Sequence, residues 1–328
     1  MTTINLDNYW YILCKSSSIT HKLTRYDFMD TSIVLFRDRL GICHSFLDFC
    51  PHRGVPLSMG KLINDQIICA YHGWRFASDG SCLEIPALKK PYSACLKPIN
   101  LLEKDGLIFA RLSGDDNQEL PSLTLQGYRR FYWERNVQGD LIDMLENLLD
   151  ATHTPYIHNT LIRSSKTPKM INAMLNRSGE GVKIIYRDEE GQEGLISKLF
   201  EKTRTHSEAI FVMPGNAEIN YYDQNGLSLK IKICLTLNRG KQYKAHIFFY
   251  LRDNFFSTIK YYLGYLFFDL ALKQDLRVLK AQFENKSKCN DTSYVVNPES
   301  DLIRLHLHDL IINRDFSKEV ARSFKLYV

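Results

Sequence analysis

Two segments decide the fold of this chain: Cys50-Pro51-His52-Arg53-Gly54 and Cys69-Ala70-Tyr71-His72-Gly73-Trp74. Each segment offers one thiolate and one imidazole, and a glycine stands one or two residues after each histidine. Four sulfur and nitrogen donors from two short loops suit either a zinc ion or an iron–sulfur centre. The residues alone therefore predict a metal centre in the first half of the chain and leave its metal open.

The two segments resemble the Rieske [2Fe–2S] signature, which is Cys-Pro-His-Arg-Gly followed by Cys-x-Tyr-His-Gly-Trp. The resemblance implies an antiparallel β domain in which Cys50 and Cys69 bind one iron through sulfur. It implies that His52 and His72 bind the other iron through nitrogen. Because two imidazoles replace two anionic thiolates, the potential of such a cluster rises to between roughly −150 and +300 mV.

The rest of the first half reads as short β-strands. Apolar runs rich in aromatic and β-branched residues are separated by loops rich in Gly, Pro and Asp, a pattern typical of strands. We expect strands at residues 8–13, 32–36 and 106–112. The polar segment 113–117 then interrupts the pattern. It predicts a boundary between a Rieske domain at residues 1–115 and a catalytic domain at residues 116–328.

The second half combines helical patterns with those of an antiparallel sheet. In residues 227–237 every second residue is Leu or Ile, which predicts a half-buried strand. A turn at 238–241 joins it to a second run at 242–251, and together they predict a hairpin. Further expected elements are a strand at 182–186 and helices at 140–153 and 255–284. The predicted fold class is therefore α+β.

A second group of possible metal donors stands in residues 146–158, Glu-Asn-Leu-Leu-Asp-Ala-Thr-His-Thr-Pro-Tyr-Ile-His. On a continuous helix Asn147, Asp150 and His153 would share one face, because they are three residues apart. The proline that follows would stop the helix and let His158 fold back beside His153. Two imidazoles and one carboxylate form the facial triad of non-haem Fe(II) oxygenases, which leaves positions open for O₂ and substrate.

The spacing Asp-x₂-His-x₄-His, preceded by Asn, resembles the catalytic-domain motif of Rieske non-haem iron oxygenases. The resemblance implies that His153 and His158 are iron ligands. It also implies that Asp150 bridges, by hydrogen bonds, from His153 to His72 of a neighbouring subunit. Asn147 would lie near the iron without ligating it firmly. Asp150 and Asn147 are thus the candidate catalytic residues.

The resemblance places the third iron ligand on a late helix, where Asp269, Asp275 and Glu284 are the candidates. Lysines four residues away predict exposed ion pairs for Asp269 and Glu284. Asp275 instead has apolar residues at all four i±3 and i±4 positions. A carboxylate in an apolar stripe is costly unless a metal or another group neutralises it. We therefore predict that Asp275 is the third ligand.

Both motifs together resemble the homo-oligomeric branch of the Rieske oxygenases, the branch of the vanillate O-demethylase and dicamba monooxygenase types. The resemblance implies a C-terminal helix-grip domain similar to START-type ligand pockets, and a mononuclear Fe(II) beside the [2Fe–2S] cluster. It implies a head-to-tail homotrimer, because a heterologous interface of this kind closes into a ring. The implied activity is O₂-dependent monooxygenation, by hydroxylation or by O- or N-demethylation of a small cyclic or aromatic molecule.

Two other functions stay open at this point. One is a cis-dihydroxylating ring dioxygenase, and the other is a non-catalytic Rieske electron carrier fused to a ligand-binding domain. The chain has no Gly-x-Gly-x-x-Gly fingerprint for a nicotinamide or flavin, so we expect electrons from a separate NAD(P)H-dependent reductase or ferredoxin. Phe211, Met213 and Asn216, on or near a strand of the catalytic half, are the candidate substrate residues.

The sequence predicts a cytoplasmic protein, because it shows neither a secretory signal nor a membrane span. Lys and Arg number 42 against 37 Asp and Glu, a net charge of +5 that favours an acidic protein partner and does not demand nucleic acid. The apolar stretch 255–272 contains Lys260 and Asp269 and predicts a helix of the protein, not a membrane span. The N-terminus shows no secretory signal. The eight cysteines, of which six are scattered outside the two motifs, are not expected to form a disulfide framework.

Overall fold

The computed structural model describes residues 6–114, 120, 122–159, 161–162, 169–187, 204–289 and 295–328. The chain divides into two compact units. The first contains Met1–Leu123 with Thr236–Tyr243, and the second contains Thr124–Leu235 with Lys244–Val328. The boundary that the sequence predicts at residues 115 and 116 lies outside the described residues.

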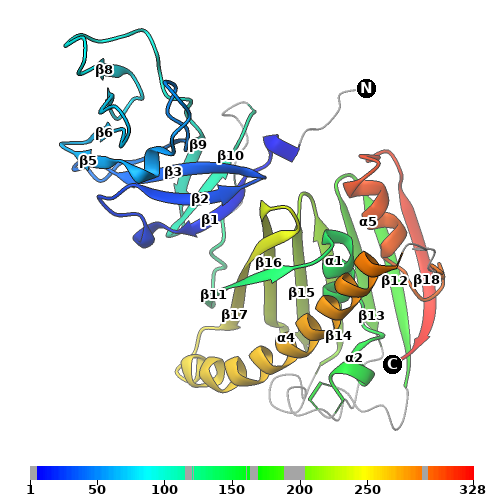
Figure 1. Cartoon of the computed structure of the whole chain (residues 1–328). Helices are drawn as coiled ribbons and strands as arrows, with labels where there is room; N and C mark the ends of the chain where they lie inside the picture. Colours follow the sequence, from blue (N-terminus) through cyan, green and yellow to red (C-terminus); the bar gives the residue numbers. More distant parts are fainter. Residues whose placement is uncertain are drawn as a thin grey trace. The chain divides into compact units, whose positions relative to one another are not determined.

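The first unit consists of three small sheets (Figure 1). Their strands are β1 (Tyr11–Lys15), β10 (Leu107–Arg111) and β9 (Asn100–Lys104); β2 (Thr24–Phe28), β3 (Thr31–Arg37) and β4 (Cys43–Leu47); and β5 (Lys61–Ile63), β6 (Gln66–Ile68), β7 (Arg75–Phe76) and β8 (Cys82–Glu84). The strands predicted at 32–36 and 106–112 are confirmed. The strand predicted at 8–13 begins only at Tyr11, because Leu6–Asn8 form a turn of 3₁₀ helix.

The core of the first unit encloses both motif cysteines. Cys50 and Cys69 lie among buried aliphatic and aromatic side chains, which include Val34, Phe36, Phe46, Leu57, Ile67, Phe76, Ile85 and Leu96. These side chains come from strands that the apolar runs specify and from the loops between them. The core therefore holds the two thiols at defined places inside the β unit.

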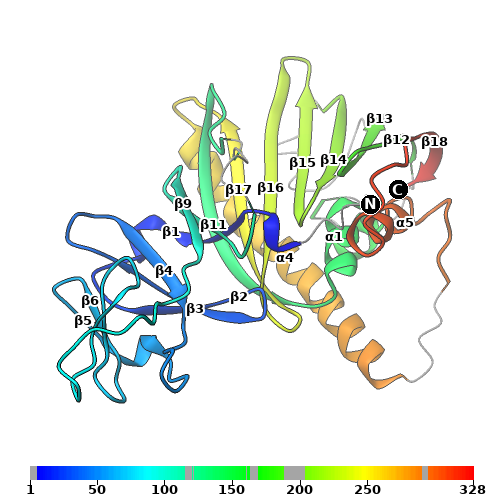
Figure 2. The same ribbon diagram turned by 90° about the horizontal axis from the view of Figure 1, so that it is seen from above.

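The second unit is built on an eight-stranded sheet (Figure 2). Its order is β11 (Tyr128–Gln138), β17 (Gln242–Arg252), β16 (Gly226–Arg239), β15 (Asn216–Asp223), β14 (His206–Val212), β13 (Gly181–Arg187), β12 (Met170–Ser178) and β18 (Val320–Tyr327). From β16 to β18 each neighbouring pair is antiparallel. Buried and less buried residues alternate along β12 and β13, as expected of strands with one face on a core.

The strand predicted at 227–237 is confirmed as β16, but its burial differs from the expectation. Leu229 and Ile231 are buried and their polar neighbours are not, whereas Cys234 and Thr236 on the other face are buried as well. Thr236 belongs to the end of the β16–β17 hairpin that is part of the first unit, where its hydroxyl donates to the carbonyl of Ile12 at 2.7 Å. The strand is therefore half-buried only along its first part.

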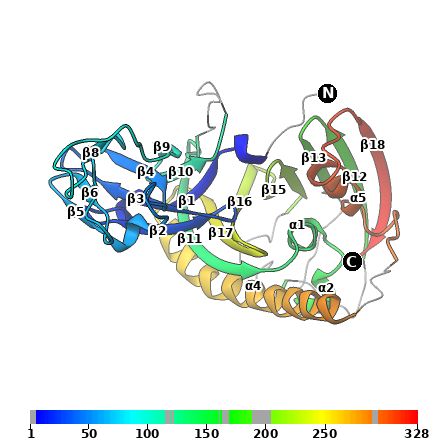
Figure 3. The ribbon, with the colours of Figure 1, turned by 45° about the horizontal axis from the view of Figure 1, so that its top comes forward.

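Helices pack on one face of the large sheet (Figures 1 and 2). They are α1 (Leu141–Leu149), α2 (Thr154–Ile157), α4 (Ser257–Lys288) and α5 (Arg304–Ile311). Figure 3 shows the single turn α2 beside the later part of α4. The α+β class is thus confirmed. Among the helices of the described residues, none combines the length and apolar character that a membrane crossing requires.

The helix predicted at 140–153 is corrected at its end. Asp140 caps the N-terminus of α1 by accepting the N–H of Ile142 at 3.2 Å, but the helix stops at Leu149. Asp150 has an extended backbone, with φ −80° and ψ 135°. Its carboxylate accepts the N–H groups of Thr152 and His153, at 2.8 and 3.1 Å. Such local side-chain bonds compete with helix propagation, so Asn147 and His153 do not share one helix.

Candidate metal centres

Two loops of the first unit have the same local geometry. The N–H of Gly54 donates to the carbonyl of Cys50 at 2.8 Å, and the N–H of Gly73 donates to that of Cys69 at 3.1 Å. Both glycines have positive φ, at 72° and 67°, a conformation that costs little only for glycine. The sequence pattern of a donor pair followed by glycine therefore produces two matching tight loops.

The loops bring the predicted donors together, with thiols inside and imidazoles outside. Cys50 and Cys69 are 1% and 4% exposed, whereas His72 is exposed and His52 half-buried. The ring centres of the two histidines are 4.6 Å apart, and His52 also stacks on Trp74 at 4.7 Å. This arrangement fits a two-iron cluster with an inner iron on sulfur and an outer iron on nitrogen.

Cys50 is a buried thiol with a second thiol beside it. Burial, with Cys69 beside it, raises the pKa of the Cys50 thiol to about 11. A thiol of this kind loses its proton at neutral pH when a cation binds, because metal coordination stabilises the thiolate. The buried thiol pair therefore fits the cluster that the motif implies.

We expect Cys69→Ala and His72→Ala to abolish the colour of the purified protein and the EPR signal of its reduced cluster. Cys82→Ala is the matched control, because Cys82 is a buried thiol of the same core, 5% exposed, outside the two motifs. Absorption spectra and EPR after reduction are the measurements. A colourless zinc-containing wild type would contradict the cluster assignment.

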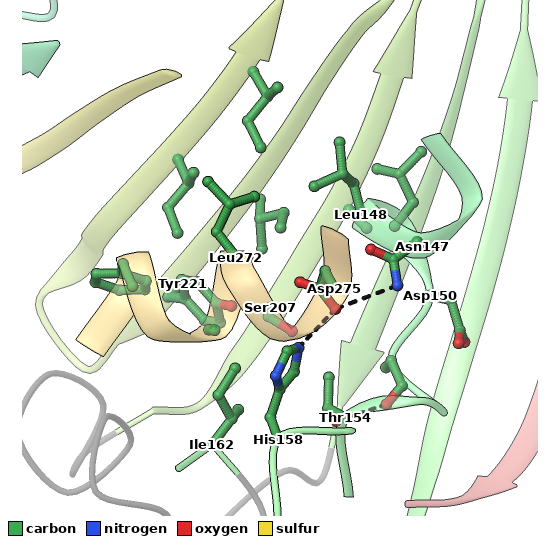
Figure 4. A pocket seen from close by; sticks show the side chains of 18 of the residues that line it. Asn147, Leu148, Asp150, Thr154, His158, Ile162, Ser207, Tyr221, Leu272 and Asp275 are labelled. Atoms are coloured by element: carbon green, nitrogen blue, oxygen red, sulfur yellow. Dashed lines mark hydrogen bonds and ion pairs between the residues drawn. The ribbon is translucent and has the colours of Figure 1, made fainter. Parts of the chain in front are cut away.

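A second set of donors meets in the second unit. Donor atoms of His153, His158 and Asp275 all lie within 4.8 Å of one another. The Nε2 atom of His158 is 3.0 Å from Asp275 Oδ1, and the Nε2 atom of His153 is 3.6 Å from the same oxygen. Figure 4 shows the Asp275 carboxylate facing the His158 ring. Two imidazoles and one carboxylate in this arrangement are the donor set of a facial triad.

Local structure places the two histidines at the ends of one helical turn. His153 precedes α2 and His158 follows it, and Pro155 lies at the start of the turn, where proline fits because the first N–H groups have no helical partner. The exposed fractions of the two side chains are 17% and 3%. The four-residue turn α2 thus brings His153 and His158, which are five residues apart in the chain, to the same site.

The electrostatics of His158 also fit a bound cation. Burial lowers the pKa of this imidazole, but the hydrogen bond and charge of Asp275, together with the hydrogen bond to Gln274, outweigh burial, so the pKa lies above its ordinary value. A proton between His158 and Asp275 occupies the place that a divalent ion would take. Metal binding would therefore displace that proton.

Asn147 lies beside Asp275 of the triad. Its Nδ2 atom donates to Asp275 Oδ1 at 3.4 Å, and Figure 4 shows this contact. Its Oδ1 atom is buried and has no hydrogen-bond partner among the described residues. A buried acceptor of this kind is costly unless a donor such as water is present. The site therefore offers a place for a further polar group next to Asp275.

Asp150 holds the loop that carries His153. Its Oδ2 atom lies 3.3 Å from His153 Nδ1 and 2.8 Å from the hydroxyl of Thr152, and its Oδ1 atom accepts the Thr152 N–H. Burial raises the pKa of this carboxyl, but the bonds from His153 and Thr152 outweigh it and lower the pKa. Among the described residues Oδ1 accepts only this one bond from Thr152, and a carboxylate oxygen can accept two, so the predicted bridge from Asp150 to His72 of a neighbouring subunit stays a prediction.

The other two carboxylates of the late helix have basic partners. Asp269 pairs with Arg135 at 2.8 Å and Lys273 at 2.7 Å, and Glu284 pairs with Lys280 at 3.8 Å. The predicted pairs with Lys273 and Lys280 are therefore confirmed. The predicted exposure is wrong for Asp269, which is only 15% exposed because Arg135 of β11 covers it.

A cavity that opens to solvent adjoins the triad. Its wall is mainly aromatic and aliphatic, and its lining includes Trp133, Tyr186, Tyr221, Phe249, Phe268, Leu148, Ile219, Ile231, Ile233, Ile247 and Leu272. Polar members other than the donors include Arg204, Ser207 and Glu208. Glu208 is already bound by Lys183 and accepts the Tyr222 hydroxyl at 3.1 Å.

The substrate residues expected from the sequence do not line this cavity. Phe211 and Met213 are buried at the end of β14 and in the turn after it, and Asn216 donates to the Met213 carbonyl at 3.2 Å. The cavity instead uses the first half of β14, residues Ser207 to Ala209. The alternating pattern of 227–237 was the usable signal, because Ile231 and Ile233 of that strand do line it.

The fold and the two donor sets point to a class of protein: an iron–sulfur β domain joined to a helix-on-sheet domain whose two histidines and one aspartate can form a facial triad. Comparison with known families agrees. The model of the Rieske [2Fe–2S] domain matches residues 9–103. The model of the vanillate O-demethylase oxygenase C-terminal domain matches residues 139–311, which is more than half of the chain. The chain therefore belongs to the Rieske oxygenases with a vanillate O-demethylase type of C-terminal domain.

Individual relatives match over shorter stretches. Chlorophyllide a oxygenase of Chlamydomonas reinhardtii is 31% identical over 54% of this chain and 28% of its own length. The vanillate O-demethylase oxygenase subunit of a Pseudomonas strain is 30% identical over 47% of this chain and 46% of its own length. The chain thus spans less than half the length of either curated relative.

The fold matches solved structures along nearly the whole chain. Dicamba monooxygenase bound to 3,6-dichlorosalicylic acid is similar with a TM-score of 0.79 and 19% sequence identity. The match covers 94% of this chain and 97% of that one. This likeness establishes the shared fold.

Proposed function

We propose that this chain is the oxygenase component of a monooxygenase that hydroxylates, or O- or N-demethylates, a small cyclic or aromatic molecule. The observation that carries the proposal is the meeting of His153, His158 and Asp275 beside an apolar cavity. The same chain holds the buried thiol pair and the imidazole pair of the first unit. An electron carrier has no need of a metal triad that opens onto a cavity.

In this proposal Cys50, His52, Cys69 and His72 hold a [2Fe–2S] cluster, and His153, His158 and Asp275 hold one Fe(II). When bound, the cluster would supply electrons one at a time and the iron would activate O₂. The domains would be residues 1–115 for the cluster and 116–328 for the iron. Asn147 and Asp150 would support the iron site through the contacts described above.

The chain's own residues would bind and orient the substrate. The aromatic and aliphatic wall of the cavity would hold an apolar ring and exclude water, because burying apolar surface is favourable. Asp150 would keep the Nδ1–H group of His153 in place, so that the Nε2 atom of that ring faces Asp275. Asn147 would offer its buried carbonyl oxygen as an acceptor beside the triad.

The proposal includes partners and a location. Electrons would come from an NAD(P)H-dependent reductase or a ferredoxin, since the motifs resemble those of oxygenase components and one relative is an oxygenase subunit. The chain would assemble as a head-to-tail homotrimer in which Asp150 approaches His72 of the next subunit. Within the described residues, which include all eight cysteines, no two cysteines are joined by a disulfide, which supports a reducing compartment such as the cytoplasm.

We expect turnover of the right substrate to add one oxygen atom or remove one methylene unit. The experiment is a screen of small aromatic and alicyclic compounds with a surrogate reductase, NADH and O₂, read by mass spectrometry. A control lacks the reductase. A product that gains two oxygens and two hydrogens would replace this proposal with a cis-dihydroxylating dioxygenase. Absence of any O₂-dependent product with both metals loaded would favour the electron carrier.

A further inference from the structure

Two consecutive residues of α4 contact opposite nitrogens of one imidazole. The Oε1 atom of Gln274 lies 2.9 Å from His158 Nδ1, and the Oδ1 atom of Asp275 lies 3.0 Å from His158 Nε2. His158 itself is 2% exposed. Neighbouring residues of a helix point about 100° apart, so α4 can hold this ring from two sides. The ring therefore has a defined position and orientation.

The Gln274 contact also determines the tautomer of His158. A neutral imidazole carries one N–H, and the oxygen of a Gln side chain can only accept a hydrogen bond. An oxygen at 2.9 Å from Nδ1 thus selects the form with hydrogen on Nδ1. Without a metal, the Asp275 carboxylate 3.0 Å away holds a second hydrogen on Nε2. When a metal ion replaces that hydrogen, the Nε2 lone pair binds the ion while Gln274 keeps the hydrogen on Nδ1. Only that form presents a metal-binding nitrogen to the triad.

The second histidine of the triad has the same arrangement with a different partner. His153 Nδ1 lies 3.3 Å from a carboxylate oxygen of Asp150, and His153 Nε2 faces Asp275. Both rings thus direct Nε2 toward one carboxylate. The partner of His158 differs in being a neutral amide, so it orients the ring without adding negative charge to the site.

We infer that Gln274 is a positioning residue, which fixes His158 as the Nδ1–H tautomer and thereby sets the affinity of the triad for a divalent metal. This inference rests on the proposed iron site. Gln274 does not belong to the donor set, and its effect on the metal passes through His158. Removing an outer hydrogen-bond partner of a metal-binding histidine typically weakens metal binding by roughly 10–100-fold.

Three variants test the inference. Gln274→Met keeps the side-chain length and removes the acceptor, whereas Gln274→Glu keeps an acceptor oxygen. Gln282→Met is the matched control, because Gln282 is on the same helix and lines a different cavity. Each full-length protein, with its cluster intact and its mononuclear iron removed by a chelator, is titrated with Co(II) and followed by d–d absorption. Zn(II)-loaded samples labelled with ¹⁵N report the histidine tautomers by NMR.

For Gln274→Met we expect Co(II) to bind about 10–100-fold more weakly, with loss of the Nδ1–H signal of His158. Gln274→Glu and Gln282→Met should keep wild-type affinity within about threefold and keep the signal.

Wild-type affinity and tautomer in Gln274→Met would overturn the inference. If Gln274→Met fails to fold, a large loss of affinity in Gln274→Glu would overturn it too. The variant His158→Ala distinguishes a failure of the Gln274 inference from a failure of the proposed iron site. Unchanged Co(II) binding in His158→Ala would mean that the proposed iron site itself is wrong.

Discussion

Asp275→Ala is expected to lose both mononuclear iron and turnover while the cluster spectrum stays intact. The variant removes the one carboxylate that both histidines face, at 3.0 and 3.6 Å. It also removes the acceptor of the Asn147 side chain. The loss of turnover should exceed the roughly 10–100-fold that removal of an outer partner costs, because a ligand itself is deleted. Iron analysis, cluster absorption and product formation are the measurements.

His153→Ala and His158→Ala should give the same result, and Asp269→Ala is the control. Asp269 is a largely buried carboxylate of the same helix, but its partners are Arg135 and Lys273. Its loss should lower stability modestly, since two ion pairs disappear, and leave the iron in place. If Asp269→Ala loses iron and Asp275→Ala keeps it, the assignment of the third ligand is wrong.

Asp150→Asn is expected to keep the cluster and most of the iron while product formation falls by on the order of 10–100-fold. Both carboxylate oxygens of Asp150 accept bonds in the His153 loop. An amide has one acceptor oxygen and one donor group, so at least one of these bonds must be lost. The variant also loses the charge that stabilises the Nδ1–H group of His153.

Single turnover is the measurement for Asp150→Asn. The protein is pre-reduced, mixed with substrate and O₂, and followed for cluster oxidation and product. We expect the wild type to oxidise its cluster and form product together, and the variant to stay reduced much longer. Thr152→Ala is a matched control, because it removes a bond to Asp150 and leaves the charge next to His153. Wild-type rates in Asp150→Asn with both metals bound would make Asp150 a purely structural loop residue.

Short-range patterns in the sequence predict much of the fold and of both donor sets. The loops at Cys50 and Cys69 close through backbone hydrogen bonds between residues four apart in the chain. The sequence motif therefore predicts the local geometry of each loop directly. The strand at 227–237 is confirmed because alternation follows directly from the pleat of a strand. The prediction of a helix at 140–153 is wrong beyond Leu149. The Asp150 carboxylate binds the backbone N–H groups of Thr152 and His153, and these bonds compete with continuation of the helix.

The sequence by itself determined which residue types could bind metal, the pairing of donors within each motif, and the α+β class. Its apolar stripe also pointed to Asp275, the carboxylate that meets the histidines in the structure. Only the tertiary structure decided which residues line the cavity and what holds His158. Gln274 and His158 are 116 residues apart in the chain, and their contact depends on how α4 is rotated on the sheet. Periodicity shows that one stripe of a helix is apolar, but many side chains together decide where each residue of that stripe lies.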